Sequence, residues 1–355
     1  MVHLDATLSD DLDVAAEEAR HIEADGFRTV WLGESKYDPF LRCYAAATAT
    51  ERLRVGTAVA IAFGRSPLTV ASTGYDLARY SRGRFILGLG SQVKSHIERR
   101  FSMPWSRPAA RMREFVCALR AIWDTWNNDA PLDFAGDFYT HTLMPPFFRP
   151  AAHPFGPPPV YLAAVGERMT EIAGEVSDGL FFHPFNTVRY LEEITLPAVA
   201  RGRERAGKTL DGFAVCGPVL TAVGRTEAEL DNAIAGVRNQ IAFYASTPAY
   251  RPVLELHGWV SVAEELTAMT KQGRWNELAA LVDDDMLHTV AVVGDVDQVS
   301  RALVERFGPI ASSISFSTPY QHDRSIWPEV ARKVAEVGTH AGRSASKSSA
   351  HDQNI

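Results

Sequence analysis

The chain has 355 residues, of which 46% are hydrophobic and 22% charged, and it carries a formal net charge of −7 at pH 7. These fractions are typical of a soluble globular protein, and the negative charge argues against binding to nucleic acid. No stretch approaches the ~18 consecutive apolar residues of a membrane span. The acidic N-terminal segment lacks the apolar run of a signal peptide, so the sequence predicts a cytoplasmic protein that needs no membrane.

The three cysteines, Cys43, Cys117 and Cys216, lie far apart and form no Cys-x-x-Cys pair. This spacing excludes a zinc-ribbon pattern and argues against a disulfide framework. Each cysteine has apolar neighbours, which predicts a small buried side chain. We therefore expect no metal centre.

Short apolar runs alternate along the chain with longer amphipathic stretches. The first half predicts helices over residues 14–24, 66–79 and 110–126, and strands over residues 29–32, 54–61 and 84–89. Ser66 and Pro67 form a typical helix start, because the hydroxyl can cap the first turn and proline suits the first helical position.

The second half predicts strands over residues 159–163, 180–183, 213–223 and 312–316, with a short apolar run at 289–293. Helices are predicted over residues 167–175, 189–206, 295–307 and 327–337, and a capping box at 226–229 opens another.

About eight strands, each followed by a helix, indicate repeated βα units. This pattern favours either a closed (β/α)8 barrel or a doubly wound parallel sheet. Residues 127–159 and 248–287 break the rhythm, and we predict that both are insertions at the barrel rim, where loops carry function. We predict one catalytic domain over residues 1–337 and a disordered polar tail over residues 338–355.

A glycine-rich loop, Gly88-Leu89-Gly90-Ser91-Gln92-Val93-Lys94, follows the predicted strand at 84–89. Its order suggests a dinucleotide-binding fingerprint, but Val93 stands where a third glycine belongs, and the strand is not the first of the chain. The glycines predict either a tight strand-to-helix turn or a backbone that a ligand approaches closely.

A second candidate loop is Ala163-Ala164-Val165-Gly166-Glu167-Arg168-Met169, where a strand ends in small residues and a helix begins near Gly166. A helix N-terminus exposes unpaired N–H groups and a partial positive charge, which suit a phosphate group. Arg168 could add a charge-assisted hydrogen bond. The alternative is a plain turn with Arg168 in solvent.

Four basic residues follow the glycine-rich loop: Lys94, His96, Arg99 and Arg100. Positions 96, 99 and 100 share one face of a helix. In an acidic protein, such a face suits an anionic ligand tail, and the alternative is an ordinary solvated surface.

These segments, in this order, resemble the bacterial-luciferase-like superfamily of flavin and deazaflavin enzymes over residues 1–335. The resemblance is carried mainly by RSPLTVASTGYDLARYSRGRFILGLGSQ and VYLAAVGERMTEIAGEVSDGLFF, with IAFYASTPAY and MLHTVAVVGDVDQV also similar. The pattern Gly-x-Gly-Ser-Gln-x-Lys followed by His-x-x-Arg-Arg is similar to the branch that uses coenzyme F420.

The resemblance implies a (β/α)8 barrel with an insertion and with the tricyclic ring of the cofactor in the barrel mouth. The back of the ring would rest against a bulge in the third strand, formed by Ala58, Val59 and Ala60. The family often has a non-prolyl cis peptide in this bulge, and the matching bond here joins Ala58 and Val59.

The resemblance also implies two further sets of cofactor-binding residues. Those along the ring edge and the ribityl chain are Ser91, Gln92, Val93 and Lys94. Those around the phosphate are Ala164, Val165, Gly166, Glu167, Arg168 and Met169.

Glu34, at the end of the second strand, matches an acidic position near the reacting face of the ring. The family often has a histidine next to this acid, but Ser35 stands here. His183, at the end of another strand, is therefore a second candidate for proton transfer, unless it is a structural residue of the rim. A set of aromatic residues suggests an apolar substrate pocket, and the alternative for many of them is a packing role: Phe63, Trp105, Phe147, Phe148, Phe182 and Phe185.

Three functions are consistent with these features. The first is hydride transfer between C5 of F420 and a small apolar organic substrate, with the protein supplying orientation and electrostatics. The second is an FMN-dependent monooxygenase that uses reduced flavin and O₂, and the third is a non-catalytic ligand-binding barrel, against which Gly88, Gly90 and Gly166 argue. The fold does not decide among them. The family also implies a homodimer.

Overall fold

The computed structural model describes the backbone of residues 2–351 and the side chains of residues 2–338. The chain forms two compact units. The N-terminal unit comprises Ala6–Phe181 and Pro197–Ala214, and the C-terminal unit comprises Met1–Asp5, Phe182–Leu196 and Val215–Ile355. The single catalytic domain over residues 1–337 stays a prediction.

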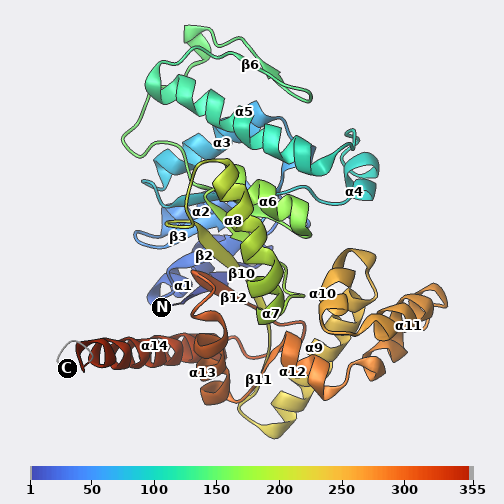
Figure 1. The fold of residues 1–355 in the computed structure, drawn as a ribbon. Coiled ribbons are helices and arrows are strands. Elements are labelled where there is room, and N and C mark those ends of the chain that lie inside the picture. The colour runs from blue at the N-terminus through green and yellow to red at the C-terminus, as the bar shows by residue number, and fades with distance from the viewer. Residues whose placement is uncertain (1, 352–355) are drawn as a thin grey trace. The chain divides into compact units, whose positions relative to one another are not determined.

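Eight parallel strands follow one another in the cyclic order of a (β/α)8 barrel (Figure 1). They are β1 (His3–Thr7), β2 (Thr29–Leu32), β3 (Arg54–Thr57), β5 (Phe85–Gly90), β8 (Val160–Ala163), β9 (Gly179–Phe181), β10 (Ala214–Val223) and β12 (Ser313–Ser317). Strand β12 pairs with both β10 and β1, and β10 also pairs with β9, so the order closes on itself. The (β/α)8 prediction is therefore confirmed, and the doubly wound sheet is excluded.

The N-terminal unit contains most of the βα repeats. Its helices are α1 (Ala15–Ala24), α2 (Pro39–Ala49), α3 (Pro67–Tyr80), α4 (Lys94–Arg99), α5 (Pro108–Asn128), α6 (Glu167–Val176) and α8 (Leu196–Arg205). Its shorter elements are strand β4 (Ala60–Ile61), the hairpin of β6 (Phe134–Ala135) and β7 (Thr140–His141), and the 3-10 helices η1 (Ala62–Gly64) and η2 (Pro146–Phe148).

The barrel strands of this unit have continuous apolar sequences because both of their faces are buried. Every residue of β2 and of β5 is buried, as expected for parallel strands covered on both faces. Helix α3 begins as predicted, with the Ser66 hydroxyl accepting a hydrogen bond from Thr69 N–H and Pro67 at the first helical position.

The C-terminal unit contains an insertion of helices after β10. Its helices are α7 (Val188–Tyr190), the π-helix η3 (Leu191–Thr195), α9 (Glu227–Ala245), α10 (Arg251–Leu256), α11 (Val260–Lys271), α12 (Asp284–Val290), α13 (Val296–Phe307) and α14 (Ile326–His351). Its shorter elements are the 3-10 helices η4 (Pro248–Tyr250) and η5 (Trp275–Leu281) and strand β11 (Val292–Gly294), which extends the pairing of β10.

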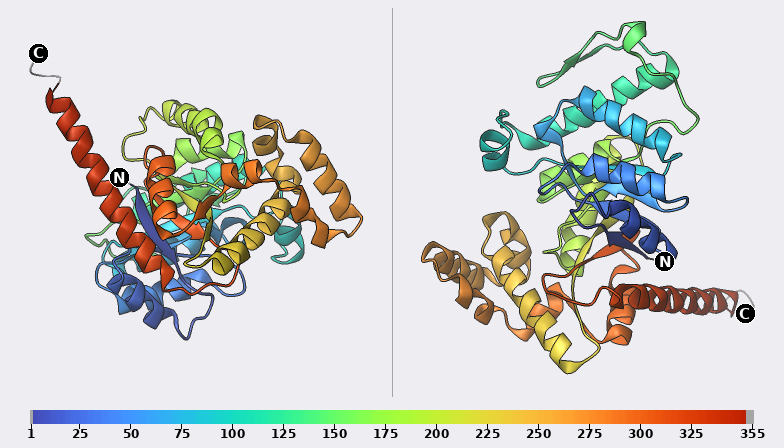
Figure 2. Two further views of the ribbon diagram at one scale, coloured as in Figure 1. Left: turned by 90° about the horizontal axis from the view of Figure 1, so that it is seen from below. Right: turned by 180° about the vertical axis from the view of Figure 1, so that it is seen from behind.

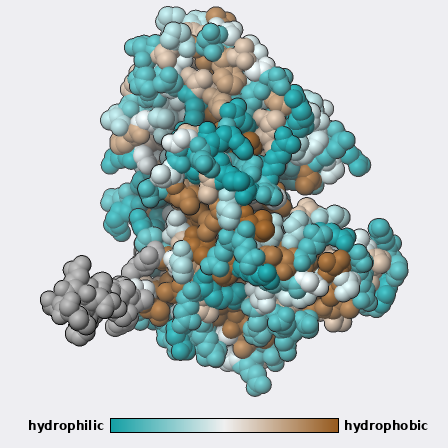
Figure 3. All heavy atoms as spheres, in the orientation of Figure 1, coloured by the Kyte–Doolittle hydropathy of each residue, from teal (hydrophilic) through white to brown (hydrophobic). Residues whose placement is uncertain are grey.

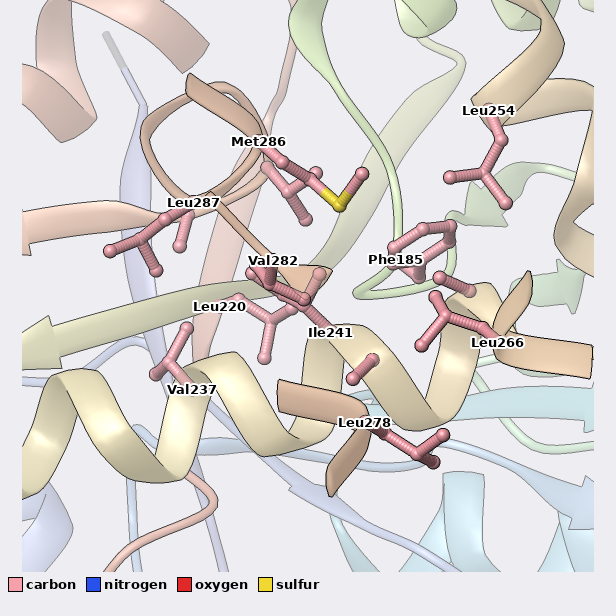
Figure 4. Packing of buried hydrophobic residues seen from close by; sticks show 14 of the residues in the cluster. Phe185, Leu220, Val237, Ile241, Leu254, Leu266, Leu278, Val282, Met286 and Leu287 are labelled. Atoms are coloured by element: carbon pink, nitrogen blue, oxygen red, sulfur yellow. The ribbon is translucent and has the colours of Figure 1, made fainter. Parts of the chain in front are cut away.

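The insertion has its own apolar core (Figure 4). Val237 and Ile241 on α9 lie among Leu266 on α11, Leu278 on η5 and Leu220 on β10, and all five are buried. This core fixes the helices of the insertion to strand β10, whose carboxyl end precedes them in the chain. The prediction of an insertion at 248–287 after a strand end is consistent with this topology.

Helix α14 runs as one straight helix next to α13 (Figure 2). It continues past residue 337, where the sequence predicts its end, to His351. The predicted disorder of the tail stays a prediction, and its last four residues lie outside those described. The visible face of the molecule is mostly hydrophilic, with scattered apolar patches (Figure 3). Within residues 2–351, no helix has both the length and the apolar character to cross a bilayer.

Candidate functional site

A bulge interrupts the third barrel strand at the predicted position. The sequence predicts one strand over residues 54–61, but β3 ends at Thr57 and β4 begins at Ala60. Gly56 pairs with Ile86 and Ala60 with Leu89, so four steps along this strand oppose three along β5. One extra residue is the definition of a bulge. The peptide bond between Ala58 and Val59 is cis, which confirms that prediction.

Thr57 satisfies the backbone groups that the bulge leaves without a strand partner. Its hydroxyl donates to the carbonyl of Gly88 at 2.6 Å and accepts from Gly88 N–H at 2.9 Å, and all of these groups are buried. A buried backbone group without a partner would cost about 1–3 kcal/mol. Thr57 therefore joins β3 to β5 where regular pairing stops.

The glycines of the predicted ligand loop serve this close approach of strands. A Cβ on Gly88 would lie 1.8 Å from the carbonyl oxygen of Thr57, and a Cβ on Gly90 would lie 2.6 Å from a methyl carbon of Val59. The interpretation that both glycines make room for a ligand is therefore corrected, since the protein itself occupies that space. Their presence also no longer argues for retained ligand binding.

Glu34 lies at the carboxyl end of β2, as predicted, and its side chain is only 7% exposed. Its Oε2 accepts hydrogen bonds from Ile61 N–H and from Arg65 Nη1, each at 2.7 Å. Arg65 also donates to Asp38 at 2.8 Å. Burial would lower the pKa of Arg65, but the bonds and charges of Glu34 and Asp38 raise it overall.

The loop after β5 brings Ser91, Gln92, Val93 and Lys94 to the carboxyl end of the strand, where the sequence places them. Gln92 has φ of 59°, in the left-handed region that non-glycine residues rarely adopt, and such residues cluster at functional sites. Val93 is 54% exposed and Lys94 is exposed, so both side chains are available to a ligand.

The loop after β8 has the geometry expected of a phosphate site. Gly166 has φ of 80°, which favours glycine, and it precedes the first turn of α6 with no side chain to cap the helix N–H groups. Val165 is 45% exposed and Arg168 is exposed. The residues predicted around the phosphate are thus brought together at one helix start: Ala164, Val165, Gly166, Glu167, Arg168 and Met169.

Charges next to this helix start are largely paired. Glu167 forms an ion pair with Arg201 of α8, and Arg201 also pairs with Glu171 at 2.7 Å. These contacts neutralise a carboxylate that would otherwise repel a phosphate at the first turn. Arg168 lines a groove on the same side of α6, together with Arg113 of α5.

The predicted basic residues occupy helix α4 and its end. His96 and Arg99 are exposed, and Lys94 lies 3.9 Å from Glu98, a contact too long and too exposed to neutralise it. Arg100 has a different role, since its guanidinium donates to the carbonyl of Ser35 at 2.7 Å.

His183 belongs to the C-terminal unit and is fully hydrogen-bonded there. Its Nδ1 accepts from Phe185 N–H at 3.1 Å, so in the neutral ring the proton sits on Nε2, which lies 2.9 Å from the hydroxyl of Tyr250. The ring also stacks on Tyr250, with centroids 4.2 Å apart. Burial lowers the pKa of His183 to about 4, so it is neutral near pH 7.

Most of the aromatic residues predicted to line a substrate pocket are packing residues. Phe63 is fully buried beneath Trp105 and Arg111, and Phe182 and Phe185 are also buried. The prediction that these three form pocket walls is wrong, because strand and helix neighbours fill the space around them.

Phe147 and Phe148 are 89% and 68% exposed, but they lie in the connection from α5 to β8. In a (β/α)8 barrel, the connection from a helix to the next strand leads to the amino end of that strand, on the face opposite the active site. The hairpin β6–β7 does return along α5 (Figure 1), where Glu114 accepts from the N–H of Tyr139. The next residue after Phe148, Arg149, nevertheless pairs with Asp129 at the far end of α5. The rim position predicted for these two aromatic residues is therefore wrong.

The functional geometry contains residues that the sequence does not single out. Thr57 reads as an ordinary strand residue, Asp38 and Arg42 lie in a stretch with no predicted element, and Arg65 reads only as the residue before a helix cap. Arg42 is fully buried and donates to the backbone carbonyls of Ser9 and Gly33. An arginine within an otherwise apolar helix was the only signal in the sequence. Among the described residues, no three His, Cys, Asp or Glu side chains gather as a metal site.

The fold and the strand-end loops define a (β/α)8 barrel that gathers its functional groups at the carboxyl ends of its strands, where such barrels have their active sites. The chain belongs to the family of luciferase-like monooxygenases, whose sequence profile matches residues 2–312.

Two relatives illustrate the range of similarity. The chain is 50% identical over 303 residues to an uncharacterized protein of Mycobacterium tuberculosis, which covers 85% of this chain and 89% of the relative. It is 27% identical over 311 residues to a candidate coenzyme F420-dependent oxidoreductase of the same species, which covers 82% of this chain and 85% of the relative.

Two solved structures share the fold. One is the coenzyme F420-dependent tetrahydromethanopterin reductase from Methanopyrus kandleri, with a TM-score of 0.77 and 23% identity over 94% of this chain and 99% of the other. The other is a type II Baeyer–Villiger monooxygenase from Pseudomonas putida in complex with FMN, with a TM-score of 0.66 and 16% identity over 95% and 99%. Similar proteins therefore include ones named for F420 and ones solved with FMN.

Proposed function

We propose that this protein is a coenzyme F420-dependent oxidoreductase, which transfers a hydride between C5 of the deazaflavin and a small apolar organic substrate. The relative named for F420 at 27% identity supports this choice. The observation that carries it is the exposed basic surface of α4, directly after the Ser91–Lys94 loop. F420 has an acidic oligoglutamate tail, which such a surface attracts.

The strand-end residues of the N-terminal unit fit a tricyclic cofactor. Ala58 and Val59 are half-buried, whereas Thr57 and Ala60 on either side are buried. The bulge therefore presents small apolar side chains at the strand end, as the back of a flat ring requires. The uncapped first turn of α6 supplies N–H donors for a phosphate.

When bound, F420 supplies the hydride chemistry at C5, and the protein supplies binding and orientation. Ala58, Val59 and Ala60 would support the ring. Ser91, Gln92, Val93 and Lys94 would follow its edge and the ribityl chain. Residues 164–169 would bind the phosphate, and Lys94, His96 and Arg99 would attract the anionic tail.

A carbonyl substrate also requires a proton. Of the two predicted candidates, Glu34 is a carboxylate already bound by two donors, whereas His183 holds a proton on Nε2 and shares it with Tyr250. Tyr250 therefore keeps its own hydroxyl proton available for donation. His183 stays a candidate for proton transfer, now together with Tyr250 of the same unit.

Charge reversal on α4 tests the choice of cofactor. The double variant His96→Glu, Arg99→Glu should raise the Kd for F420 about tenfold, equivalent to ~1.4 kcal/mol, and leave the Kd for FMN within about twofold. The loss should shrink at high salt, because exposed charges are screened. Absorbance titration of both cofactors measures this.

Arg52→Glu is the control, since Arg52 is an exposed cation at the amino end of β3. Equal losses for F420 and FMN would contradict the assignment of the anionic tail to α4. Tight binding of FMN with no binding of F420 would favour the flavin monooxygenase, and binding of neither would favour a non-catalytic barrel.

A further inference from the structure

The chain just after the bulge is held by the end of β2 without regular strand pairing. Strand β2 pairs with β3 as far as Leu32. Beyond it, Glu34 N–H donates to the carbonyl of Val59 at 3.3 Å, and Glu34 Oε2 accepts from Ile61 N–H at 2.7 Å. The carboxylate therefore takes the place that a backbone carbonyl has in a regular parallel ladder.

Arg65 completes this support from the other side. Its Nη1 donates both to Glu34 Oε2 at 2.7 Å and to the carbonyl of Ile61 at 3.1 Å. Its Nη2 donates to Asp38, which in turn caps α2 by accepting from Phe40 N–H at 2.8 Å. The N–H of Ile61 is thus bound by Glu34 and its carbonyl by Arg65.

The bonds around Glu34 join it to Arg65 in a largely buried ion pair. Both donors, Ile61 N–H and Arg65, point at one carboxylate oxygen, and the side chains of Glu34 and Arg65 are 7% and 16% exposed. Removing one partner of a buried ion pair leaves an uncompensated charge, which is strongly destabilising.

We propose that Glu34 and Arg65 are positioning residues that fix the Ala58–Ala60 bulge in the shape that receives the cofactor ring, and that Glu34 takes no part in proton transfer to the substrate. This inference rests on the proposed function only in requiring that a flavin or deazaflavin binds at the bulge. It assigns Arg65, whose guanidinium donates to Glu34, Ile61 and Asp38, an indirect part in cofactor affinity.

The test compares variants that change either charge or geometry. Glu34→Gln removes the charge but keeps an amide oxygen that can accept from Ile61 N–H, and Glu34→Asp keeps a carboxylate but shortens its reach to Ile61 N–H. Both should raise the Kd of the cofactor about tenfold or more, as should Arg65→Met. The double variant Glu34→Gln, Arg65→Met should bind no more weakly than the worse single variant, because the two residues act as one unit.

Glu23 offers a matched control at the opposite end of the same strand. Its Oε1 accepts from Arg52 N–H and Leu53 N–H, each at 2.7 Å, just before β3 begins. Glu23→Gln therefore weakens a similar carboxylate–backbone support. It should lower the thermal midpoint of unfolding and leave the cofactor Kd within about twofold.

Absorbance titration with F420 and with FMN gives the Kd values, and the pH profile of kcat/KM for the cofactor-dependent reaction gives a second measurement. A positioning role predicts weaker binding with an unchanged profile. Wild-type binding in Glu34→Asp and Glu34→Gln, with loss of one limb of the profile only in Glu34→Gln, would show a proton carrier and overturn the proposal. If Glu34→Gln does not fold, Glu34→Asp and Arg65→Met still decide.

The two proposals fail differently. If the wild type binds FMN and not F420, the proposed function fails and the same variants test the support of the bulge with FMN. If the wild type binds F420 and the Kd is unchanged in Glu34→Asp and Arg65→Met, the positioning role fails and the proposed function stands. Binding of neither cofactor would overturn both.

Discussion

His183 carries a pH dependence of stability that can be measured. Its pKa is lowered to about 4 by burial, from an ordinary value near 6.5. As the pH falls from 6.5 towards 4, His183 binds a proton in the unfolded chain but stays neutral in the folded protein. The contribution of His183 to the free energy of unfolding should therefore be fully present above pH 6.5. It should fall by up to about 1.4 kcal/mol for each pH unit as the pH drops from 6.5 towards 4.

The variant His183→Asn has no titrating group at this position. Urea unfolding at pH 7 and pH 5 should show a smaller loss of stability in the variant than in the wild type. Identical losses would mean that His183 is protonated in the folded state, and the assignment of its neutral tautomer would then be wrong.

Glycine is required at position 88 because strands β3 and β5 approach closely there, whereas position 74 has room for a larger side chain. A Cβ at Gly88 would lie 1.8 Å from a backbone oxygen of Thr57, whereas a Cβ at Gly74 would make only ordinary contacts at 3.5 Å or more. We expect Gly88→Ala to lose about 2 kcal/mol or more of unfolding free energy. Gly74→Ala, inside helix α3, should be neutral or gain up to ~1 kcal/mol. Chemical denaturation of both variants checks this, and equal stabilities would contradict the packing described.

At the level of residues, the sequence predicts local backbone features better than it predicts what each residue does. The cis bond between Ala58 and Val59 was predicted by resemblance and the helix start near Gly166 from the sequence, whereas the phosphate at that helix start stays a prediction. The role of Gly88 was not predicted, because the sequence does not distinguish a glycine that makes room for a neighbouring strand from one that makes room for a ligand. Arg65 was missed because its partners Glu34 and Asp38 are about thirty residues away in sequence.

At the level of elements, the bulge depends on a side chain. Thr57→Val keeps the shape of the residue but leaves Gly88 N–H and its carbonyl buried without the hydroxyl. We expect a loss of about 1–3 kcal/mol in unfolding free energy. Thr57→Ser retains the hydroxyl and should lose less. Equal losses in the two variants would show that the methyl group, and not the hydrogen bonds, stabilises this position.

Most barrel strands and many of the helices could be predicted from periodicity and caps, and most of their ends agree with the structure within one or two residues, although α14 continues to His351 and the run at 289–293 spans the end of α12 and the start of β11. The exceptions have physical causes. The run at 54–61 is uniformly apolar, so no pattern marks the break between β3 and β4. The helix predicted over residues 189–206 contains the π-helical turn η3, which side-chain periodicity does not reveal.

At the level of the whole molecule, the alternation of strands and helices is sufficient to predict the (β/α)8 barrel. The first strand, β1, received no range from the sequence, since its five residues mix polar and apolar types. The division into two units could not be predicted, because it depends on contacts between segments distant in sequence. The homodimer and the cytoplasmic location stay predictions.

The most direct test of the account is a titration of the purified wild-type protein with F420 and, separately, with FMN, followed by absorbance and fluorescence. The account predicts saturable binding of F420 at one site per chain, with a Kd at least about tenfold below that of FMN, equivalent to ~1.4 kcal/mol or more. Saturable binding of FMN with no binding of F420 would contradict the proposed function.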